Sequence, residues 1–319
     1  MARGARLACR DNGSKRLDFD ISNVYLVCIE ASDALASRSI VFPPRASRLL
    51  HAEIMNPHTQ DLSRALPDSL KQLKRVRHET RRRDLTVAAV ENLTPGMRRV
   101  RLQSPELADF VSLSPDDHIK LFFPAADGTA AMRDYTPRAF DPLLGSLTID
   151  FALHGEGQEA GPATAWALAA KPGDTLQIGG PRGSTIIPDV FDWYLLVGDE
   201  TALPAIGRRL EELRPAAVVK TVVAVDSAAE IQSIKSPARW DATWIRRDTD
   251  GSDDAANARR AIDRAMPTSG EGFVWIAGEA QFARTLRAHL IEVRGHPAAR
   301  MKAAGYWIRG DAGGYISLD

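Results

Sequence analysis

The sequence predicts a two-domain protein in which an antiparallel β-barrel precedes an α/β domain with a parallel sheet, after a small N-terminal α+β extension. Residues 81–188 carry short alternating strands separated by turn residues, as in small barrels. Residues 189–319 alternate apolar strands with helices, which indicates a parallel sheet covered on both faces. Residues 1–80 follow neither pattern, and a chain of 319 residues is long enough to build two cores.

Within the extension, residues 18–27 and 39–42 have the composition of short strands. Residues 61–82 are predicted as a basic amphipathic helix, because leucines recur on one face. The leucines of that face are Leu62, Leu66, Leu70 and Leu73. The basic end of this helix, KQLKRVRHETRRR, has the charge to contact nucleic acid, but a solvated helix end and linker is the favoured interpretation.

The barrel is predicted to contain several short strands and one helix. The strands are residues 85–92, 97–103, 118–123, 131–136, 146–153 and 175–179. Turn sequences such as Thr94-Pro95-Gly96 and Asp127-Gly128 separate them. The helix is expected at residues 161–170, before the last strand.

The α/β domain is predicted to contain a strand at each of residues 193–197, 218–225, 242–246 and 272–277. The helices are residues 201–213, 254–266 and 281–294, with a helical turn at 228–234 and a further helical region around 297–304. Because helices separate the strands, we expect the strands to run parallel.

Composition excludes several classes of function. Lysine plus arginine and aspartate plus glutamate are equal at 41 each, so net charge gives no reason to expect binding to nucleic acid or membranes. No apolar run could span a membrane, and the basic start lacks the apolar core of a secretory signal, so we expect a cytoplasmic protein. The two cysteines cannot hold a four-cysteine cluster, and the seven histidines show no ligand spacing. We therefore expect no metal site, and an organic cofactor for any electron transfer.

The most informative motif is the run Arg133-Asp134-Tyr135-Thr136-Pro137-Arg138. On a strand, Arg133 and Tyr135 share a face, and Thr136 adds a hydroxyl beside them. A cation, a planar ring and a small hydroxyl suit a large aromatic phosphate ester such as a flavin nucleotide. The alternative is a plain surface strand that ends at Pro137.

A strand ending at His154 leads into a glycine-rich approach to the next helix, which opens with Gly161-Pro162-Ala163-Thr164. Backbone N–H groups and the helix dipole at such a start form an anion site suited to a pyrophosphate. The alternative is an ordinary N-cap after a flexible loop.

Further candidates lie at the domain junction and along the parallel sheet. The turn Gly179–Ser184 lies at the junction, where cofactor sites are common. The run Gly198–Ala205 is a strand–turn–helix of the kind at which open α/β sheets bind nucleotides, although the pattern Gly-x-Gly-x-x-Gly is absent. Glu279 occupies the equivalent loop after the fourth strand. Arg246 and Arg247 are either ligands of the 2′-phosphate of NADPH or a solvated charge pair.

Together these motifs resemble those of the ferredoxin–NADP reductase superfamily, and within it those of the siderophore-interacting proteins, which are NADPH-dependent ferric-siderophore reductases. The resemblance covers roughly residues 80–315 and rests on motifs that occur in the family's order. They are R-x-Y-T (133–136) with Arg138, D-F-A-L-H-G (150–155), G-P-A-T-x-W-A (161–167), G-P-R-G-S (180–184), V-G-D-E-T-A-L-P-A-I (197–206), A-G-E (277–279) and Y-W-I-R-G (306–310).

The resemblance implies a flavin domain at residues 81–188, a nicotinamide domain at 189–319, and FAD and NADPH (or NADH) as cofactors. It implies that Arg133 meets FAD phosphate or ribitol oxygens, while Tyr135 and Thr136 are the catalytic residues against the flavin ring. The remaining cofactor-binding candidates in the flavin domain are Arg138, Asp150, His154, Gly161, Ala163, Thr164, Arg182 and Ser184. Those in the nicotinamide domain are Asp199, Thr201, Ala202, Arg246, Arg247 and Glu279.

The implied activity is electron transfer from NAD(P)H through FAD to a ferric siderophore, with release of Fe(II) by a monomeric enzyme. Flavin suits this task because it exchanges both paired and single electrons. Arg300, Lys302 and Arg309 either attract an anionic siderophore or are solvated charges. Two alternatives stay open: another flavin or oxygenase-partner reductase of the superfamily, and a siderophore-binding protein without catalysis.

Overall fold

The computed structural model describes residues 6–10, 16–20, 68–124, 130–154, 161–310 and 315–318. The chain divides into two compact units, Met1–Leu62 and Ser63–Asp319. In the first unit, β1 (Arg6–Arg10) pairs antiparallel with β2 (Arg16–Asp20). The strand predicted at 18–27 overlaps β2, whereas the strand predicted at 39–42 lies outside the described residues.

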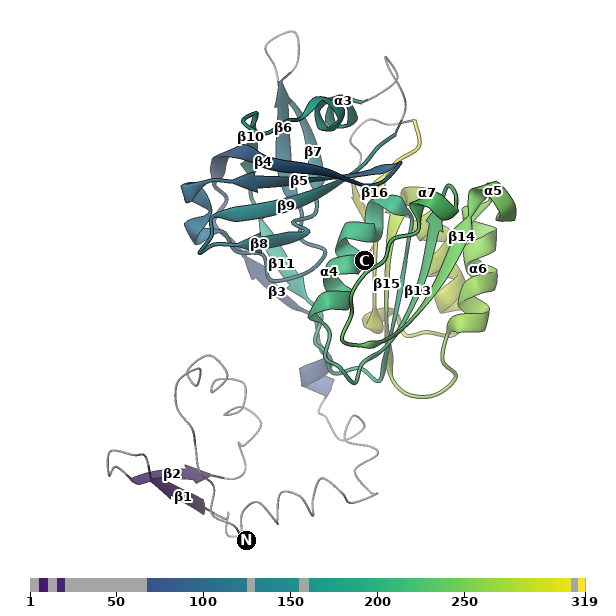
Figure 1. Cartoon of the computed structure of the whole chain (residues 1–319). Coiled ribbons are helices and arrows are strands. Elements are labelled where there is room, and N and C mark those ends of the chain that lie inside the picture. The colour runs from purple at the N-terminus through teal and green to yellow at the C-terminus, as the bar shows by residue number, and fades with distance from the viewer. Residues whose placement is uncertain are drawn as a thin grey trace. The chain divides into compact units, whose positions relative to one another are not determined.

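The second unit begins with an antiparallel sheet that wraps around one core (Figure 1). Its order is β7-β6-β10-β4-β5-β9-β8. The strands are β4 (Arg82–Thr94), β5 (Met97–Gln103), β6 (Ile119–Pro124), β7 (Ala130–Tyr135), β8 (Ala139–Asp141), β9 (Ser146–Ala152) and β10 (Thr175–Gly179). The six strands predicted from alternation are confirmed, and β8 was not predicted. The predicted helix is also confirmed, as α3 (Pro162–Ala169), which packs on the same core through Ala163 and Ala167.

The helix predicted at residues 61–82 is wrong over its described part. A 3₁₀ turn at Asp68–Lys71 leads into β3 (Lys74–Arg77), and β4 already begins at Arg82. β3 pairs antiparallel with β11 (Gly183–Ile186), so its backbone hydrogen bonds go to a segment far along the chain. The leucine spacing therefore does not mark one buried face: Leu70 is exposed, while Leu73 packs against the core of the α/β domain.

The α/β domain contains a sheet in the order β14-β13-β12-β15-β16-β17. The first five of these strands run parallel, and β17 is antiparallel to β16. The strands are β12 (Trp193–Gly198), β13 (Val218–Val225), β14 (Arg239–Arg246), β15 (Gly272–Glu279), β16 (Met301–Trp307) and β17 (Ile316–Ser317). The four predicted strands are confirmed as β12 to β15.

Helices cover both faces of this sheet (Figure 1). α4 (Leu203–Glu212) packs on the core that also holds Tyr194 and Leu196, whereas α6 (Asp254–Ala265) and α7 (Ala280–Ala288) pack on the core that holds Leu195 and Val197. Successive β12 residues thus point to opposite buried faces, as in a covered parallel sheet. Shorter helical segments are Pro105–Asp109, Glu200–Ala202, Ala228–Glu230, α5 (Arg247–Asp250), a π-helical turn at His289–Val293, and Ala298–Arg300.

The helical region predicted around residues 297–304 is wrong beyond a single 3₁₀ turn, because residues from Met301 onward form β16. This strand packs closely against α7: a Cβ added to Gly305 would lie 2.8 Å from the Cβ of Ala280. The close approach requires small residues, and the resulting Ala-Ala-Gly tract is easily taken for part of a helix.

The strand order places the sheet's topological switch point at β12, because the chain proceeds from β12 to β13 and β14 on one side and then to β15 on the other. Ligands of open α/β sheets bind at such a point, beyond the carboxyl ends of the strands. Among the described residues, none of the helices combines the length and apolar character that spanning a bilayer requires.

Candidate functional site

A cavity of about 650 Å³ lies between the barrel and the carboxyl ends of the α/β strands. Its barrel side is lined by His118, Arg133, Asp134, Tyr135, Thr136, Asp150, Ala152, His154, Gly161, Pro162, Ala163 and Thr164. Its α/β side is lined by Thr201, Pro204, Tyr306, Trp307, Ile308, Gly310 and Tyr315. This volume lies within the range of cofactor pockets.

Strand β7 supplies an aromatic ring and a cation to the cavity wall. Tyr135 packs against Phe151, with ring centroids 4.5 Å apart, and against Phe123 at 6.5 Å. Burial raises the pKa of the Tyr135 hydroxyl, so this side chain is a neutral ring surface at physiological pH. Among the described residues, the Arg133 guanidinium donates one hydrogen bond, to the carbonyl of Met132 (2.8 Å).

The N-terminus of α3 supplies backbone donors. Gly161 is the N-cap and forms no side-chain cap, and the first intrahelical bond runs from Ala165 N–H to the Gly161 carbonyl. The N–H groups of Ala163 and Thr164 precede that bond, in the first turn, whose N–H groups have no partner within the helix. Since both residues line the cavity, these donors favour an anion there.

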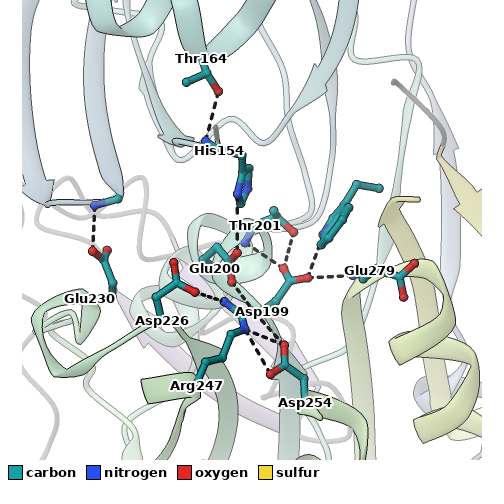
Figure 2. Close-up of polar contacts among 12 residues, drawn as sticks. His154, Thr164, Asp199, Glu200, Thr201, Asp226, Glu230, Arg247, Asp254 and Glu279 are labelled. Carbon is teal, nitrogen blue, oxygen red and sulfur yellow. Dashed lines mark hydrogen bonds and ion pairs between the residues drawn. The ribbon is translucent and has the colours of Figure 1, made fainter. Parts of the chain in front are cut away.

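His154 lies between the two walls (Figure 2). Its backbone N–H donates to the Thr164 hydroxyl (3.4 Å), and its Nδ1 lies 3.8 Å from Oε1 of Glu200. Its ring is 6.1 Å from that of Trp307. Burial lowers the pKa of His154, which keeps the imidazole neutral at physiological pH.

Asp199 ties the switch-point loops together (Figure 2). It follows β12 and is 2% exposed. One carboxylate oxygen accepts from Thr201 N–H (2.9 Å) and from the Thr201 hydroxyl. The other accepts from the N–H of Glu279 (2.8 Å), the last residue of β15, and from Nε1 of Trp307 (2.9 Å), the last residue of β16. Both carboxylate oxygens of Asp199 are thus used to hold Thr201 and Trp307, which line the cavity, whereas Asp199 itself does not line it.

Arg247 forms a second group of contacts at the strand ends (Figure 2). Its guanidinium pairs with Glu200 (2.9 Å), Asp226 (2.7 Å) and Asp254 (2.8 Å). Burial, reinforced by Asp199, raises the pKa of Glu200 to about 7, although Arg247 opposes the shift. Arg246 lies outside this cluster; its guanidinium donates to the Thr249 hydroxyl (3.0 Å).

Other predicted residues lie outside the cavity. The Arg138 guanidinium is buried and bonds both Glu211 oxygens (2.7 and 2.6 Å), which links the barrel to α4. The Ser184 hydroxyl donates to Asp117 (2.6 Å), Arg182 is exposed, and Ala202 is in the core. Asp150 lines the cavity, but its carboxylate is held by both Nε and Nη2 of Arg99 (2.7 and 2.8 Å).

The carboxylate of Glu279 caps α7 by accepting from the N–H groups of Gln281 (2.7 Å) and Phe282 (2.9 Å). The C-terminal cations differ from one another. Lys302 is largely buried and pairs with Asp116 (2.5 Å), and Arg300 pairs with Glu271 (2.5 Å). Arg309 is exposed, and its guanidinium lies over the Trp307 ring, 6.0 Å from the ring centroid.

Sequence reasoning missed the aromatic part of the α/β wall. Tyr306, Trp307 and Tyr315 line the cavity, as does His118 from the barrel. The available signal was the Tyr306–Gly310 motif, which contributed to the resemblance but was given no role. Among the described residues, no cluster of His, Cys, Asp or Glu is arranged to hold a metal ion.

The fold and the cavity define a class of protein: a flavin-binding barrel followed by a nicotinamide-type α/β domain. Ferredoxin–NADP⁺ reductase from Plasmodium falciparum, 11% identical, superimposes with a TM-score of 0.55 over 68% of this chain and 94% of that chain, which shows the shared fold. Within this class, a family model described as "Siderophore-interacting FAD-binding domain" matches residues 86–131 and 125–185, and one described as "Siderophore-interacting protein" matches residues 191–310.

The chain belongs to the siderophore-interacting protein family. It is 35% identical over 255 residues to the NADPH-dependent ferric-chelate reductase of Escherichia coli K12, which covers 73% of this chain and 96% of the relative. A crystal structure of a siderophore utilization protein from T. fusca, also 35% identical, superimposes with a TM-score of 0.69 over 76% of this chain and 98% of that chain. The predicted family, two-domain fold and reductase resemblance are confirmed.

The cavity fits the FAD that this family's domain binds. Tyr135 offers a neutral aromatic surface for a flat ring, and the first turn of α3 offers backbone donors for phosphate oxygens. Arg133 adds a cation on the same wall. A planar apolar surface combined with anion donors is the chemistry that a flavin dinucleotide requires.

Proposed function

We propose that this protein is a monomeric, cytoplasmic, FAD-containing reductase that uses NAD(P)H to reduce ferric siderophores and releases Fe(II). The observation that carries the proposal is a cavity shared by both domains, lined by Arg133, Tyr135 and the α3 N-terminus on one side, and by Thr201 and Trp307 on the other. FAD supplies the exchange between the two electrons of a nicotinamide hydride and the single electrons that Fe(III) accepts.

The barrel residues bind and orient the flavin. Tyr135 packs against the ring, and the neighbouring hydroxyl of Thr136 is the candidate partner for the reacting nitrogen N5. Arg133 would pair with the phosphates as a cation, and the N–H groups of Ala163 and Thr164 would donate hydrogen bonds to them. His154, whose pKa is lowered by burial, is a neutral hydrogen-bonding group beside the phosphate-binding helix start.

The α/β residues form the wall that receives the nicotinamide nucleotide. Thr201 and Trp307 lie at the cavity surface, and Asp199 holds both from behind through hydrogen bonds. Ala202 and Glu279 support the same wall, through the core and through the cap of α7. Asp199 and Glu279 are therefore positioning residues in this proposal.

The test measures flavin absorbance and the release of Fe(II) in the same sample. The purified protein is loaded with FAD, reduced anaerobically with NADPH or NADH, and then mixed with a ferric catecholate chelate and a dye specific for Fe(II). We expect a yellow protein that bleaches with the nicotinamide and recovers its colour as Fe(II) appears. A protein that does not take up FAD, or whose flavin does not bleach with either nucleotide, would refute the proposal that it is a flavin-dependent reductase. Colour recovery with cytochrome or free flavin but never with ferric chelates would identify another reductase of the superfamily.

A single substitution tests the assignment of the barrel wall. Arg133→Ala should weaken FAD binding about 10- to 100-fold, because a hydrogen bond to a charged group contributes roughly 1.5–3 kcal/mol. The matched control is Arg101→Ala on β5, an exposed arginine with one carboxylate partner, Glu91, at 3.8 Å. Titration of the apoprotein with FAD, followed by flavin fluorescence, gives both dissociation constants. Equal affinities for the two variants would remove Arg133 from the site.

A further inference from the structure

The strand ends of the α/β domain hold an arginine enclosed by carboxylates. Arg247 follows β14, Asp226 follows β13, and Glu200 lies just beyond β12, so contacts among them join three neighbouring strands (Figure 2). Asp254, at the start of α6, completes the group.

The donors of Arg247 are largely used inside this group. Nε and one Nη2 donor bond Asp254 (2.9 and 2.8 Å), a second Nη2 donor bonds Glu200 (2.9 Å), and Nη1 bonds Asp226 (2.7 Å). Since a guanidinium has five N–H groups, four of them have carboxylate partners here. An incoming phosphate would have to displace a carboxylate to reach this cation, and would meet the negative charge of the group.

Asp226 is the outward-facing member of the group. Its side chain is 78% exposed, whereas those of Glu200, Arg247 and Asp254 are 18%, 21% and 19% exposed. It also stands at the end of the second strand of the domain. In doubly wound sheets that bind dinucleotides at a Gly-x-Gly-x-x-Gly turn, an acidic residue about 20 residues beyond that turn accepts a hydrogen bond from the adenosine ribose 2′-hydroxyl, whereas a nearby arginine accommodates a 2′-phosphate. This chain lacks that turn, and the comparison rests on the place of Asp226 at the carboxyl end of the second strand.

Resting on the proposed function, we propose that Asp226 is the specificity-determining residue for the nicotinamide nucleotide. Its carboxylate accepts a hydrogen bond from the 2′-hydroxyl of NADH and repels the 2′-phosphate of NADPH, while Arg247 is held away from that phosphate. NADH is then the better electron donor for this chain.

Arg246 is the competing candidate. It is the last residue of β14, its side chain is 36% exposed, and its described partners are a hydroxyl and, at 3.9 Å, the Asp248 carboxylate. If Arg246 bound the 2′-phosphate, its removal would lower the use of NADPH selectively. Asp226 alone is expected to control the preference, so Arg246→Ala belongs in the test.

Asp226→Asn is a clean perturbation because Arg247 keeps Glu200 and Asp254, and because the altered side chain is mostly exposed. The matched control is Asp241→Asn. Asp241 is also a mostly exposed carboxylate (67%) paired with a cation, Lys220, at 2.6 Å, but it lies near the amino end of β14, away from the carboxyl ends of the strands.

The experiment measures nucleotide binding and turnover with the full chain. Binding of ADP-ribose and of 2′-phospho-ADP-ribose is measured by calorimetry, and kcat/KM is measured with NADH and NADPH on the FAD-loaded protein. We expect the wild type to favour the unphosphorylated ligands, and Asp226→Asn to shift both ratios toward the phosphorylated ligands at least tenfold, with Asp241→Asn unchanged.

The outcomes are distinguishable. A wild type that prefers the 2′-phosphorylated ligands, or ratios that stay within twofold in Asp226→Asn, would overturn the role of Asp226 and leave the reductase intact. A selective loss of NADPH use in Arg246→Ala would overturn it as well. If neither nucleotide binds nor bleaches the flavin, the proposed function itself fails.

Discussion

Asp199 offers the sharpest test of how the α/β wall is built. Substitution Asp199→Asn keeps the size of the side chain but replaces one accepting oxygen with an NH₂ donor. Asp199 accepts from Thr201 N–H, the Thr201 hydroxyl, Glu279 N–H and Nε1 of Trp307. If the remaining oxygen faces Thr201, the new NH₂ group faces two N–H donors that can no longer be satisfied.

The magnitude follows from those two lost bonds. A hydrogen bond to a charged acceptor contributes roughly 1.5–3 kcal/mol, and a buried donor left without a partner carries its full desolvation penalty. Because the loops can relax and admit water, we expect the free energy of unfolding to fall by about 3 kcal/mol, at the low end of that sum. The displaced Trp307 and Thr201 should also raise KM for the nicotinamide nucleotide about tenfold. The affinity for FAD should stay constant, since the barrel wall is untouched.

Urea denaturation, FAD titration and steady-state kinetics measure these three quantities. The matched control is Asp192→Asn at the other end of β12. Asp192 also accepts a backbone N–H from the β15 side, that of Glu271 (2.6 Å), but lies far from the cavity. It should lose stability without a change in KM. An Asp199→Asn protein with wild-type stability and a KM within twofold would refute the assigned role.

Two further predictions concern buried charge. Burial raises the folded-state pKa of Glu200 from 4.5 to about 7, so the folded state keeps a proton that the unfolded state has lost, and the free energy of unfolding falls as pH rises through that window. Glutamine cannot titrate, so Glu200→Gln should abolish this pH-dependent fall, which amounts to up to about 3 kcal/mol. Measured by urea denaturation between pH 4.5 and 7.5, the free energy of unfolding of the variant should therefore rise relative to that of the wild type as the pH increases. Parallel curves for the two proteins would contradict this. Arg138→Ala should cost about 2 kcal/mol, because the Arg138 side chain is only 9% exposed and gives up two hydrogen bonds to the Glu211 carboxylate, which is itself 42% exposed. Lys220→Ala, at a surface pair with Asp241, should cost less than about 1 kcal/mol, and equal losses on denaturation would show that the Arg138 contact is no stronger than a surface pair.

The elements that the sequence predicted well are those whose signal is local. β5 and β13 were predicted with their observed ends, because alternation and apolar runs bounded by turn residues define a strand without reference to its partners. β3 and β16 were mistaken for helices because their stability comes from distant partners. β3 pairs with β11, and β16 requires small residues to pack against α7. Pairing of this kind overrides local propensity.

The candidate site divides in the same way. Arg133, Tyr135 and Thr136 line one cavity, because strand positions so close in sequence are brought together by local geometry, and their contact with a flavin stays a prediction. The sequence could not predict that the guanidinium donors of Arg247 are already paired with carboxylates and so are not free for a phosphate. Its partners Asp254, Asp226 and Glu200 lie 7, 21 and 47 residues away, and only the folded sheet brings them together.

The same long-range pairing changes the interpretation of the C-terminal cations. Lys302 is separated by most of the chain from its partner Asp116, and the pair is largely buried between the barrel and β16. In a buried pair the geometry and desolvation of both groups matter more than net charge, so such a lysine contributes to domain docking and offers little attraction to an anionic substrate.

The two walls of the cavity differ in how their polar groups are used. On the barrel wall, the first-turn N–H groups of α3 have no intrahelical partner, and Arg133 donates to one backbone carbonyl among the described residues. On the α/β side, Asp199 and Arg247 are engaged with protein groups. Donors already positioned for an anion lose little entropy when they bind it, whereas engaged groups must exchange partners. This asymmetry favours a phosphate-bearing cofactor that stays on the barrel and a nucleotide that leaves the α/β wall after each turnover.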